Sequence, residues 1–221
     1  MNTRNIFILG FILLSISTSF SQSSKSSLGF EGGPSFVSSY GNERLKESRV
    51  AAFSFSGGFS YQYRISDLLS LQTNLSFERK GLGAEDEVFN ESGEVNGKVI
   101  SRFHLNYLTV PVMCRVTFGE KIKFFANAGP YAGVLLSQRT IRENTREADS
   151  RKESNDIEIY DRMDYGVSSG VGINFQILQD LMLGFELRNN LGLVNISPLP
   201  VFGGTIRNNT TSLLIGIAFN L

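Results

Sequence analysis

The sequence predicts an all-β protein: an eight-stranded, antiparallel, up-and-down transmembrane β-barrel with short turns at one end and long loops at the other. Apolar and polar residues alternate through almost the whole chain after its first 21 residues, as strands with one apolar face require. Short and long connections alternate between these segments, and no helical period of useful length occurs among them. The 18 Phe and 22 Gly among 221 residues also favour strands joined by tight turns.

The overall composition excludes several classes of function. The chain has 21 Lys and Arg against 21 Asp and Glu, so it lacks the excess positive charge of a nucleic-acid-binding protein. Its single Cys excludes a disulfide scaffold or a multi-cysteine metal site, and its single His excludes a poly-histidine metal centre. We therefore expect no nucleic-acid partner and predict no cofactor.

The first 21 residues have the pattern of a cleaved signal peptide. Arg4 precedes the apolar run Ile6–Ile16, which is followed by small polar residues, and the pattern places cleavage near Ser21 and Gln22. The run is shorter than the roughly 20 apolar residues that a membrane-spanning helix needs, which argues against an uncleaved anchor. The prediction is a signal peptide at residues 1–21 and one barrel domain at residues 22–221.

The first four predicted strands differ in regularity. Leu28–Phe36 alternates loosely, whereas Ala51–Arg64 alternates Phe and Tyr with Ser, Gly and Gln. Leu69–Phe77 alternates Leu and Phe with Ser, Gln and Asn. In Phe103–Phe118 the apolar phase shifts by one residue across Thr109–Pro111. A β-bulge there explains the shift, because Pro within a strand is found at bulges or edges.

The last four predicted strands alternate clearly. Ile122–Leu136 and Tyr165–Ile177 place aliphatic and aromatic residues opposite Gly, Ser and Asn. Leu181–Leu193 opposes Leu and Phe to Gly, Glu, Arg and Asn, and Ser212–Leu221 carries Leu, Ile and Phe at every second position. Each is long enough for a tilted membrane strand, which needs about 9–11 residues.

The connections define the two ends of the predicted barrel. Three are short: Ile65–Asp67, Gly119–Glu120 and Leu178–Asp180. Four are long and polar: Ser39–Val50, Gly81–Ser101, Gln138–Met163 and Ser197–Asn209. Short turns at one end and long loops at the other are typical of outer-membrane barrels.

The choice of outward face separates a membrane barrel from a soluble, lipocalin-like barrel, which has an apolar lumen. Here the polar face is mostly Ser, Gly, Asn and Gln with scattered charges, which suits a narrow lumen better than a water-exposed exterior. We therefore predict an apolar face toward lipid and a lumen filled with side chains that form a polar, structural network. Its predicted members are Glu31, Arg64, Glu78, Arg102, His104, Arg115, Lys123, Glu186 and Arg188.

Two segments carry a family resemblance. The segment Asn106–Val112 contains Tyr107, Leu108 and Pro111 in a Tyr-Leu-x-x-Pro pattern, and Ala128–Leu136 contains Gly129, Pro130, Tyr131 and Gly133. Together with Asp164-Tyr165-Gly166, they resemble the markers of PorT-like outer-membrane barrels of the Bacteroidetes, in the same order and spacing. The resemblance implies an eight-stranded barrel in the outer membrane of a Gram-negative cell. It also implies a possible link to protein secretion, the process with which the namesake is associated.

The leading functional hypothesis is a non-enzymatic outer-membrane barrel with a structural, adhesive or secretion-associated role and with its surface loops as the contact region. Expected partners are outer-membrane lipid, periplasmic chaperones and the barrel-assembly machinery, with a secretion-machinery or surface partner of unknown identity. A barrel hydrolase of lipid or peptide with His104 as base, and a secreted ligand-binding barrel, are the alternatives. Because no nucleophile motif accompanies His104 and the acidic loop Glu85–Glu94 lacks calcium-loop spacing, we predict no catalytic residue and no metal ligand.

Overall fold

The computed structural model describes residues 25–42, 49–50, 52–89, 92–93, 95–144, 152–154, 161–197 and 204–221. The predicted signal peptide at residues 1–21 lies outside the described residues and stays a prediction. No helix among the described residues is long and apolar enough to cross a membrane.

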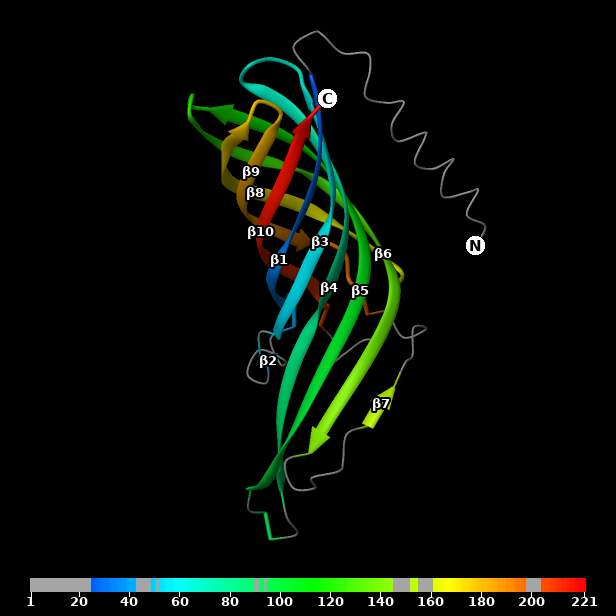
Figure 1. The fold of residues 1–221 in the computed structure, drawn as a ribbon. Coiled ribbons are helices and arrows are strands. Elements are labelled where there is room, and N and C mark those ends of the chain that lie inside the picture. The colour runs from blue at the N-terminus through cyan, green and yellow to red at the C-terminus, as the bar shows by residue number, and fades with distance from the viewer. Residues whose placement is uncertain are drawn as a thin grey trace, which may run out of the picture.

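Eight long strands close into one antiparallel ring, which confirms the predicted fold class (Figure 1). Around the ring the order is β1, β3, β4, β5, β6, β8, β9 and β10, and β10 pairs again with β1. Two short strands lie outside the ring, β2 against β4 and β7 against β6. The strands are β1 (Ser26–Tyr40), β2 (Arg49–Val50), β3 (Ala52–Arg64), β4 (Leu69–Phe89), β5 (Val95–Phe118), β6 (Ile122–Asn144), β7 (Lys152–Ser154), β8 (Met163–Leu178), β9 (Leu181–Gly192) and β10 (Arg207–Asn220).

The alternation of the sequence becomes the two faces of the barrel wall. Phe53 and Phe59 on β3 point outward with 70% and 66% of their surface exposed, whereas the serines between them are buried or half-buried. Aromatic pairs cross the outer surface, such as Phe30 and Phe59 with ring centroids 5.6 Å apart. An apolar exterior of this extent is costly in water and suits lipid. We call this surface the apolar band.

Three short turns join the strands at one end of the barrel, where the sequence predicts them. They connect β3 to β4, β5 to β6, and β8 to β9. Gly119 shows why one of these turns requires glycine: its φ is +101°, and a Cβ there would lie 2.3 Å from the carbonyl oxygen of Ile122. The N-terminal and C-terminal strands pair at this end, with Leu28 opposite Phe219. We call it the turn end and the opposite end the loop end.

At the loop end the structure corrects the prediction of a long loop at Gly81–Ser101. β4 continues to Phe89 and β5 begins at Val95, so most of this segment is a β-hairpin. β6 also continues to Asn144, and the three strands run well past the others (Figure 1). We call this extension the protruding sheet, and define it as residues 82–89, 95–103 and 140–144.

The structure also corrects the predicted bulge at Thr109–Pro111. β5 keeps a single phase there, with Leu105, Tyr107, Thr109, Pro111 and Met113 all buried on the inward face. The irregularity lies one strand away, where Asn106 pairs with Ser137 but Tyr107 pairs with Leu135, so that β6 has one extra residue. Leu105 and Tyr107 are therefore apolar residues that face the lumen. Their side chains do not mark a shift in the alternation of β5.

Candidate functional site

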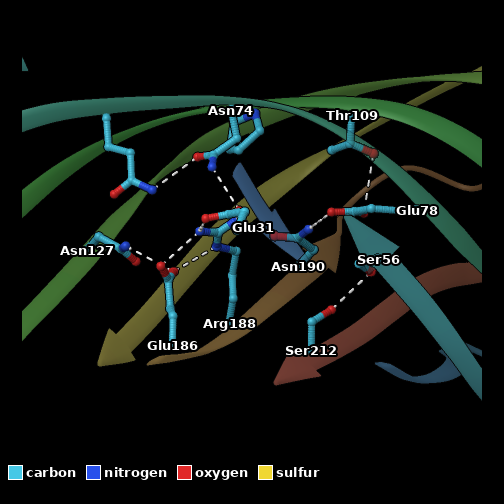
Figure 2. Close-up of polar contacts among 12 residues, drawn as sticks. Glu31, Ser56, Asn74, Glu78, Thr109, Asn127, Glu186, Arg188, Asn190 and Ser212 are labelled. Atoms are coloured by element: carbon cyan, nitrogen blue, oxygen red, sulfur yellow. Dashed lines mark hydrogen bonds and ion pairs between the residues drawn. The ribbon is translucent and has the colours of Figure 1, made fainter. Parts of the chain in front are cut away.

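A cluster of four charged side chains crosses the lumen nearer the turn end. Figure 2 shows three of them: Glu31, Glu186 and Arg188. Arg188 on β9 donates from Nε and Nη2 to the two carboxylate oxygens of Glu186, at 2.7 and 2.8 Å. Its Nη1 also donates to Oε1 of Glu31 on β1, and Arg115 on β5 donates to Oε2 of Glu186 at 3.1 Å. All four side chains are buried, so we call them the Arg188 cluster. Two cations balance two carboxylates.

Neutral side chains complete the hydrogen bonding of the Arg188 cluster. Asn74 donates to Oε1 of Glu31 at 2.8 Å, and Asn127 donates to Oε1 of Glu186 at 3.0 Å (Figure 2). Arg115 lies 3.6 Å from the ring centroid of Phe125, a cation–π contact. A buried ion pair overcomes its desolvation cost only when further hydrogen bonds satisfy the remaining lone pairs, and these residues supply them.

Small residues on β8 make room for this cluster. A Cβ on Gly170 would lie 2.6 Å from Oε1 of Glu186 and 2.7 Å from Oδ1 of Asn127. A Cβ on Gly172 would lie 2.4 Å from the ring of Phe125. The glycines of this strand thus leave the space that the charged and aromatic side chains from neighbouring strands fill.

A second charged cluster lies nearer the loop end. Nζ of Lys80 donates to Oδ2 of Asp164 at 3.0 Å and lies 3.4 Å from Oε2 of Glu78. The ammonium group also lies 4.3 Å from the ring centroid of Tyr131 and 5.3 Å from that of Tyr107. We call Glu78, Lys80 and Asp164 the Lys80 cluster. The aromatic rings replace part of the water that this fully buried cation loses.

The carboxylates of the Lys80 cluster also bind neutral donors. Asn190 donates to Oε1 of Glu78 at 2.6 Å and Thr109 donates to Oε2 at 3.2 Å (Figure 2). The hydroxyl of Tyr131 and the amide of Asn208 donate to Oδ2 of Asp164 at 3.2 and 3.0 Å.

An apolar group closes the lumen beyond the Lys80 cluster. The connection after β9 folds inward, and the backbone N–H of Ile196 donates to the carbonyl of Ile206 at 2.9 Å. Both isoleucines pack against buried residues of β5 and β6. We call this group the apolar plug; it consists of Leu105, Tyr107, Leu135, Ile196 and Ile206.

The structure brings together five of the nine residues predicted for the lumen network, in two separate clusters. Glu31, Arg115, Glu186 and Arg188 form one, and Glu78 belongs to the other.

Two further predicted residues, Arg64 and Lys123, lie apart from both clusters. They line a cavity of about 220 Å³ at the turn end, together with Asp67 of the neighbouring turn. This cavity is polar and opens beside the short turns, so the two cations are at the mouth of the lumen rather than in its interior.

The structure contradicts the lumen placement of Arg102 and His104. Both lie on the outward face of β5, beyond the apolar band, and Arg102 pairs there with Glu143 at 2.9 Å. The physical reason is the unbroken phase of β5: because Leu105 and Tyr107 face the lumen, the alternate positions of Arg102 and His104 face outward. The predicted position of His104 in the lumen is therefore wrong.

Sequence reasoning missed Lys80 and Asp164 as members of the network. Lys80 faces the lumen, as Ser76 and Glu78 do on the same strand. It lies beyond Phe77, the last residue of the predicted strand. Asp164 belongs to the family marker Asp164-Tyr165-Gly166, and the marker alone does not indicate a partner in the lumen. Following the inward phase of each strand past its last apolar residue would have found both.

The geometry of the lumen favours a structural role for these charges. Each carboxylate already contacts a cation and at least one neutral donor. Within the described residues no group of three or more His, Cys, Asp or Glu side chains could hold a metal ion. Glu91 and Glu94 of the acidic loop lie outside the described residues.

The sequence profile of the outer membrane protein beta-barrel domain family matches residues 20–197. The chain belongs to this family. The apolar band therefore faces the lipid of the outer membrane, and the turn end and loop end correspond to the periplasmic and extracellular ends of such barrels.

Among solved structures, that of Neisserial surface protein A agrees with this fold. Neisserial surface protein A is 13% identical, with a TM-score of 0.51, over 90% of this chain and 98% of that one. Ail, the attachment invasion locus protein of Yersinia pestis, is 13% identical with a TM-score of 0.41, over 90% of this chain and 100% of that one. OprG from Pseudomonas aeruginosa is 7% identical with a TM-score of 0.45, over 92% and 100%. No curated protein matched the chain.

Proposed function

We propose that this outer-membrane barrel is a non-enzymatic anchor that holds the protruding sheet outside the cell as a contact surface, in a structural or adhesive role. The observation that carries the proposal is the contrast between the two ends of the same strands. Inside the barrel, β4, β5 and β6 contribute to a lumen filled by two charged clusters and an apolar plug. Beyond the barrel the same strands form an extended sheet.

The side chains that fill the lumen argue against a pore for solutes and support a role for the protein as an anchor. Along β5, Leu105 and Tyr107 of the plug are followed by Thr109, which binds Glu78, and then by Arg115 of the Arg188 cluster. These layers lie in series along the barrel axis. Small eight-stranded barrels have interiors just wide enough for side chains to fill, in agreement with this arrangement.

Such an anchor needs partners during its biogenesis and, as a contact surface, after its insertion into the membrane. Periplasmic chaperones and the barrel-assembly machinery are the expected partners during biogenesis, because an unfolded chain with this apolar band aggregates in water. The resemblance to PorT-like barrels adds the secretion machinery as a class of partner for the mature protein. A surface protein on another cell is the adhesive counterpart.

Truncation of the protruding sheet tests the proposal. A variant in which residues 84–101 are replaced by Asn-Gly keeps the pairing of Gly83 with Arg102 and should still insert, as shown by heat-modifiable gel mobility, because the barrel and its plug are intact. It should lose cell-surface adhesion or partner capture that the full chain supports. Contact activity that survives the truncation would contradict the proposal.

A second measurement tests the closed lumen. The full chain in planar lipid bilayers should give no stable conductance steps. Steady conductance from the unmodified protein would identify an open pore and overturn the anchor role.

A further inference from the structure

The polar cavity of about 220 Å³ at the turn end is lined by residues from six strands, and we call it the turn-end cavity. The strand residues face inward, so the cavity is reached from the periplasm and not from the lipid. Asp67 of the turn between β3 and β4 also lines it. The strand residues that line it include Arg64 on β3, Ser70 on β4, Thr117 on β5, Lys123 on β6, Asn174 on β8 and Met182 on β9.

The charges of the turn-end cavity are not balanced as those of the Arg188 cluster are. In that cluster two cations and two carboxylates lie within ion-pair distance of one another. In the cavity, Arg64 and Lys123 carry two positive charges against the single negative charge of Asp67. Within the part of the chain that the structure describes, neither cation forms an ion pair with a carboxylate. The cavity therefore has one positive charge in excess and two cationic groups that can bind an anion.

Neutral hydrogen-bonding groups lie beside the cations. The strand register pairs Arg64 with Ser70. Nε2 of Gln62 donates to Oγ of Ser70 at 3.0 Å, while Oε1 of Gln62 accepts from Nη1 of Arg115 at 3.2 Å. The Ser70 oxygen thus already accepts a hydrogen bond, and its own hydrogen can be donated to a ligand. Through Gln62 and Arg115 the wall of the cavity is also joined to the Arg188 cluster, which holds that wall in place.

We propose that the turn-end cavity binds the carboxylate of a small molecule or of a chain end in the periplasm. The planar guanidinium of Arg64 matches the two oxygens of a carboxylate, and Lys123 and Ser70 add further donors. One negative charge matches the single positive charge in excess, whereas a doubly charged phosphate meets stronger repulsion from Asp67.

The size of the cavity agrees with this ligand. Its volume of about 220 Å³ equals about seven water molecules and is below the roughly 300 Å³ at which pockets for drug-sized ligands begin. The cavity therefore admits a carboxylate group with a few attached atoms, and the rest of a longer molecule stays outside the mouth.

Met182 lines the cavity and provides a direct probe of binding. The protein, labelled with ¹³C at its methionine methyl groups and reconstituted in zwitterionic nanodiscs, is titrated by NMR at constant ionic strength. The ligands are acetate and N-acetyl-trialanine, which ends in one carboxylate. Both should shift the Met182 signal saturably, and neither should move the signal of Met163 at the loop end. The amide of N-acetyl-trialanine should give no shift.

The two ligands distinguish the sources of the carboxylate. Tighter binding of the peptide supports a chain end, and tighter binding of acetate supports a free small molecule. No shift of Met182 with either carboxylate, or an equal shift with the amide, would overturn the proposal. Tighter binding of inorganic phosphate than of both carboxylates would overturn the assignment to a carboxylate.

Substitutions test whether the charges of the cavity are responsible. Arg64→Gln and Lys123→Gln should each weaken binding of the tighter carboxylate about tenfold, as expected for one lost hydrogen bond to a charged group. Asp67→Asn should strengthen binding, because it removes a like charge. Lys121→Gln is the matched control, because it also removes one positive charge at the turn end, but from an exposed residue that does not line the cavity. Heat-modifiable mobility verifies that each variant is folded. Wild-type binding by the Arg64 and Lys123 variants, or an equal loss in the Lys121 variant, would refute a local site.

Discussion

Ion pairs of the same chemistry occur in two regions of this protein with very different surroundings. In the lumen, the Arg188 and Glu31 side chains are 3% and 10% exposed, whereas in the protruding sheet those of Arg102 and Glu143 are 44% and 38% exposed. Water and salt screen the second pair, so its net contribution is small. The lumen pair has little screening, and removing one partner leaves a charge without water or counter-ion.

This difference separates the roles of the two regions. The lumen charges connect strands across the barrel, because the four residues of the Arg188 cluster come from β1, β5 and β9. The exterior charges add little to the stability of the barrel and are available for contacts with lipid or a partner. Substitutions in the lumen and in the protruding sheet test whether charged residues stabilise the first region more than the second.

Removal of Arg188 should have the largest effect. Arg188→Met leaves Glu31 without its cation and Glu186 with Arg115 alone, and should lower the free energy of unfolding by about 3–5 kcal/mol. Urea unfolding of the protein refolded into phospholipid vesicles measures this loss. Arg188→Lys keeps the charge without the planar fork and should lose less. A loss below about 1 kcal/mol in the Met variant would mean that water screens the lumen charges as it does those outside.

Removal of Lys80 should have a similar but smaller effect, about 3 kcal/mol, because Lys80 donates one hydrogen bond to a carboxylate whereas Arg188 donates four. Lys80→Met leaves Glu78 and Asp164 buried without a cation. The double variant Lys80→Met with Asp164→Asn should recover part of the loss, since one of the two uncompensated charges is removed. A double-mutant cycle in the same unfolding assay gives this coupling. Additive losses would show that the two side chains do not interact.

The sequence was sufficient to predict the barrel but only part of its interior. Alternation and the position of short turns predict the eight strands and the lipid-facing band, because both depend on the period of a single strand. Contacts between strands, such as that of Glu31 with Arg188, depend on the register between strands and on closure of the barrel. The alternation within one strand contains no information about either. The prediction assumed that apolar strand residues face lipid. Leu105 and Tyr107 of the apolar plug face the lumen instead, so the side chains between and beside them were assigned to the wrong face.

Overpacking of the Arg188 cluster should have an intermediate effect. In Gly170→Ala the added methyl group meets Glu186 and Asn127, and the free energy of unfolding should fall by about 1–3 kcal/mol. The matched control is Ser169→Ala, the adjacent outward-facing residue, which should be close to neutral. Urea unfolding in vesicles compares the two. If Gly170→Ala is as stable as the control, the charged cluster can rearrange and does not fix the barrel.

Loss of an exterior ion pair should be barely measurable. Glu143→Gln removes the partner of Arg102 and should change the free energy of unfolding by less than about 0.5 kcal/mol. Added salt should reduce even this difference, whereas salt should not restore Arg188→Met. A loss comparable to that of the lumen variants would show that the protruding sheet is part of the cooperative unit of the barrel.

The smallest expected effect is a pH dependence confined to the exterior, at His104. Burial and the three neighbouring arginines lower its pKa in the folded protein below the ordinary value of 6.5. As the pH falls below about 6.5, the unfolded chain takes up this proton before the folded chain does, so the free energy of unfolding decreases; above that range His104 contributes no such loss. His104→Gln should therefore flatten the pH dependence of unfolding between about pH 7 and pH 5, measured in zwitterionic vesicles. Arg139→Gln should flatten it in part, because one of the three repelling charges is gone. A His104→Gln variant with the slope of the wild type would mean that the positive charges of Arg79, Arg102 and Arg139 do not act on this imidazole.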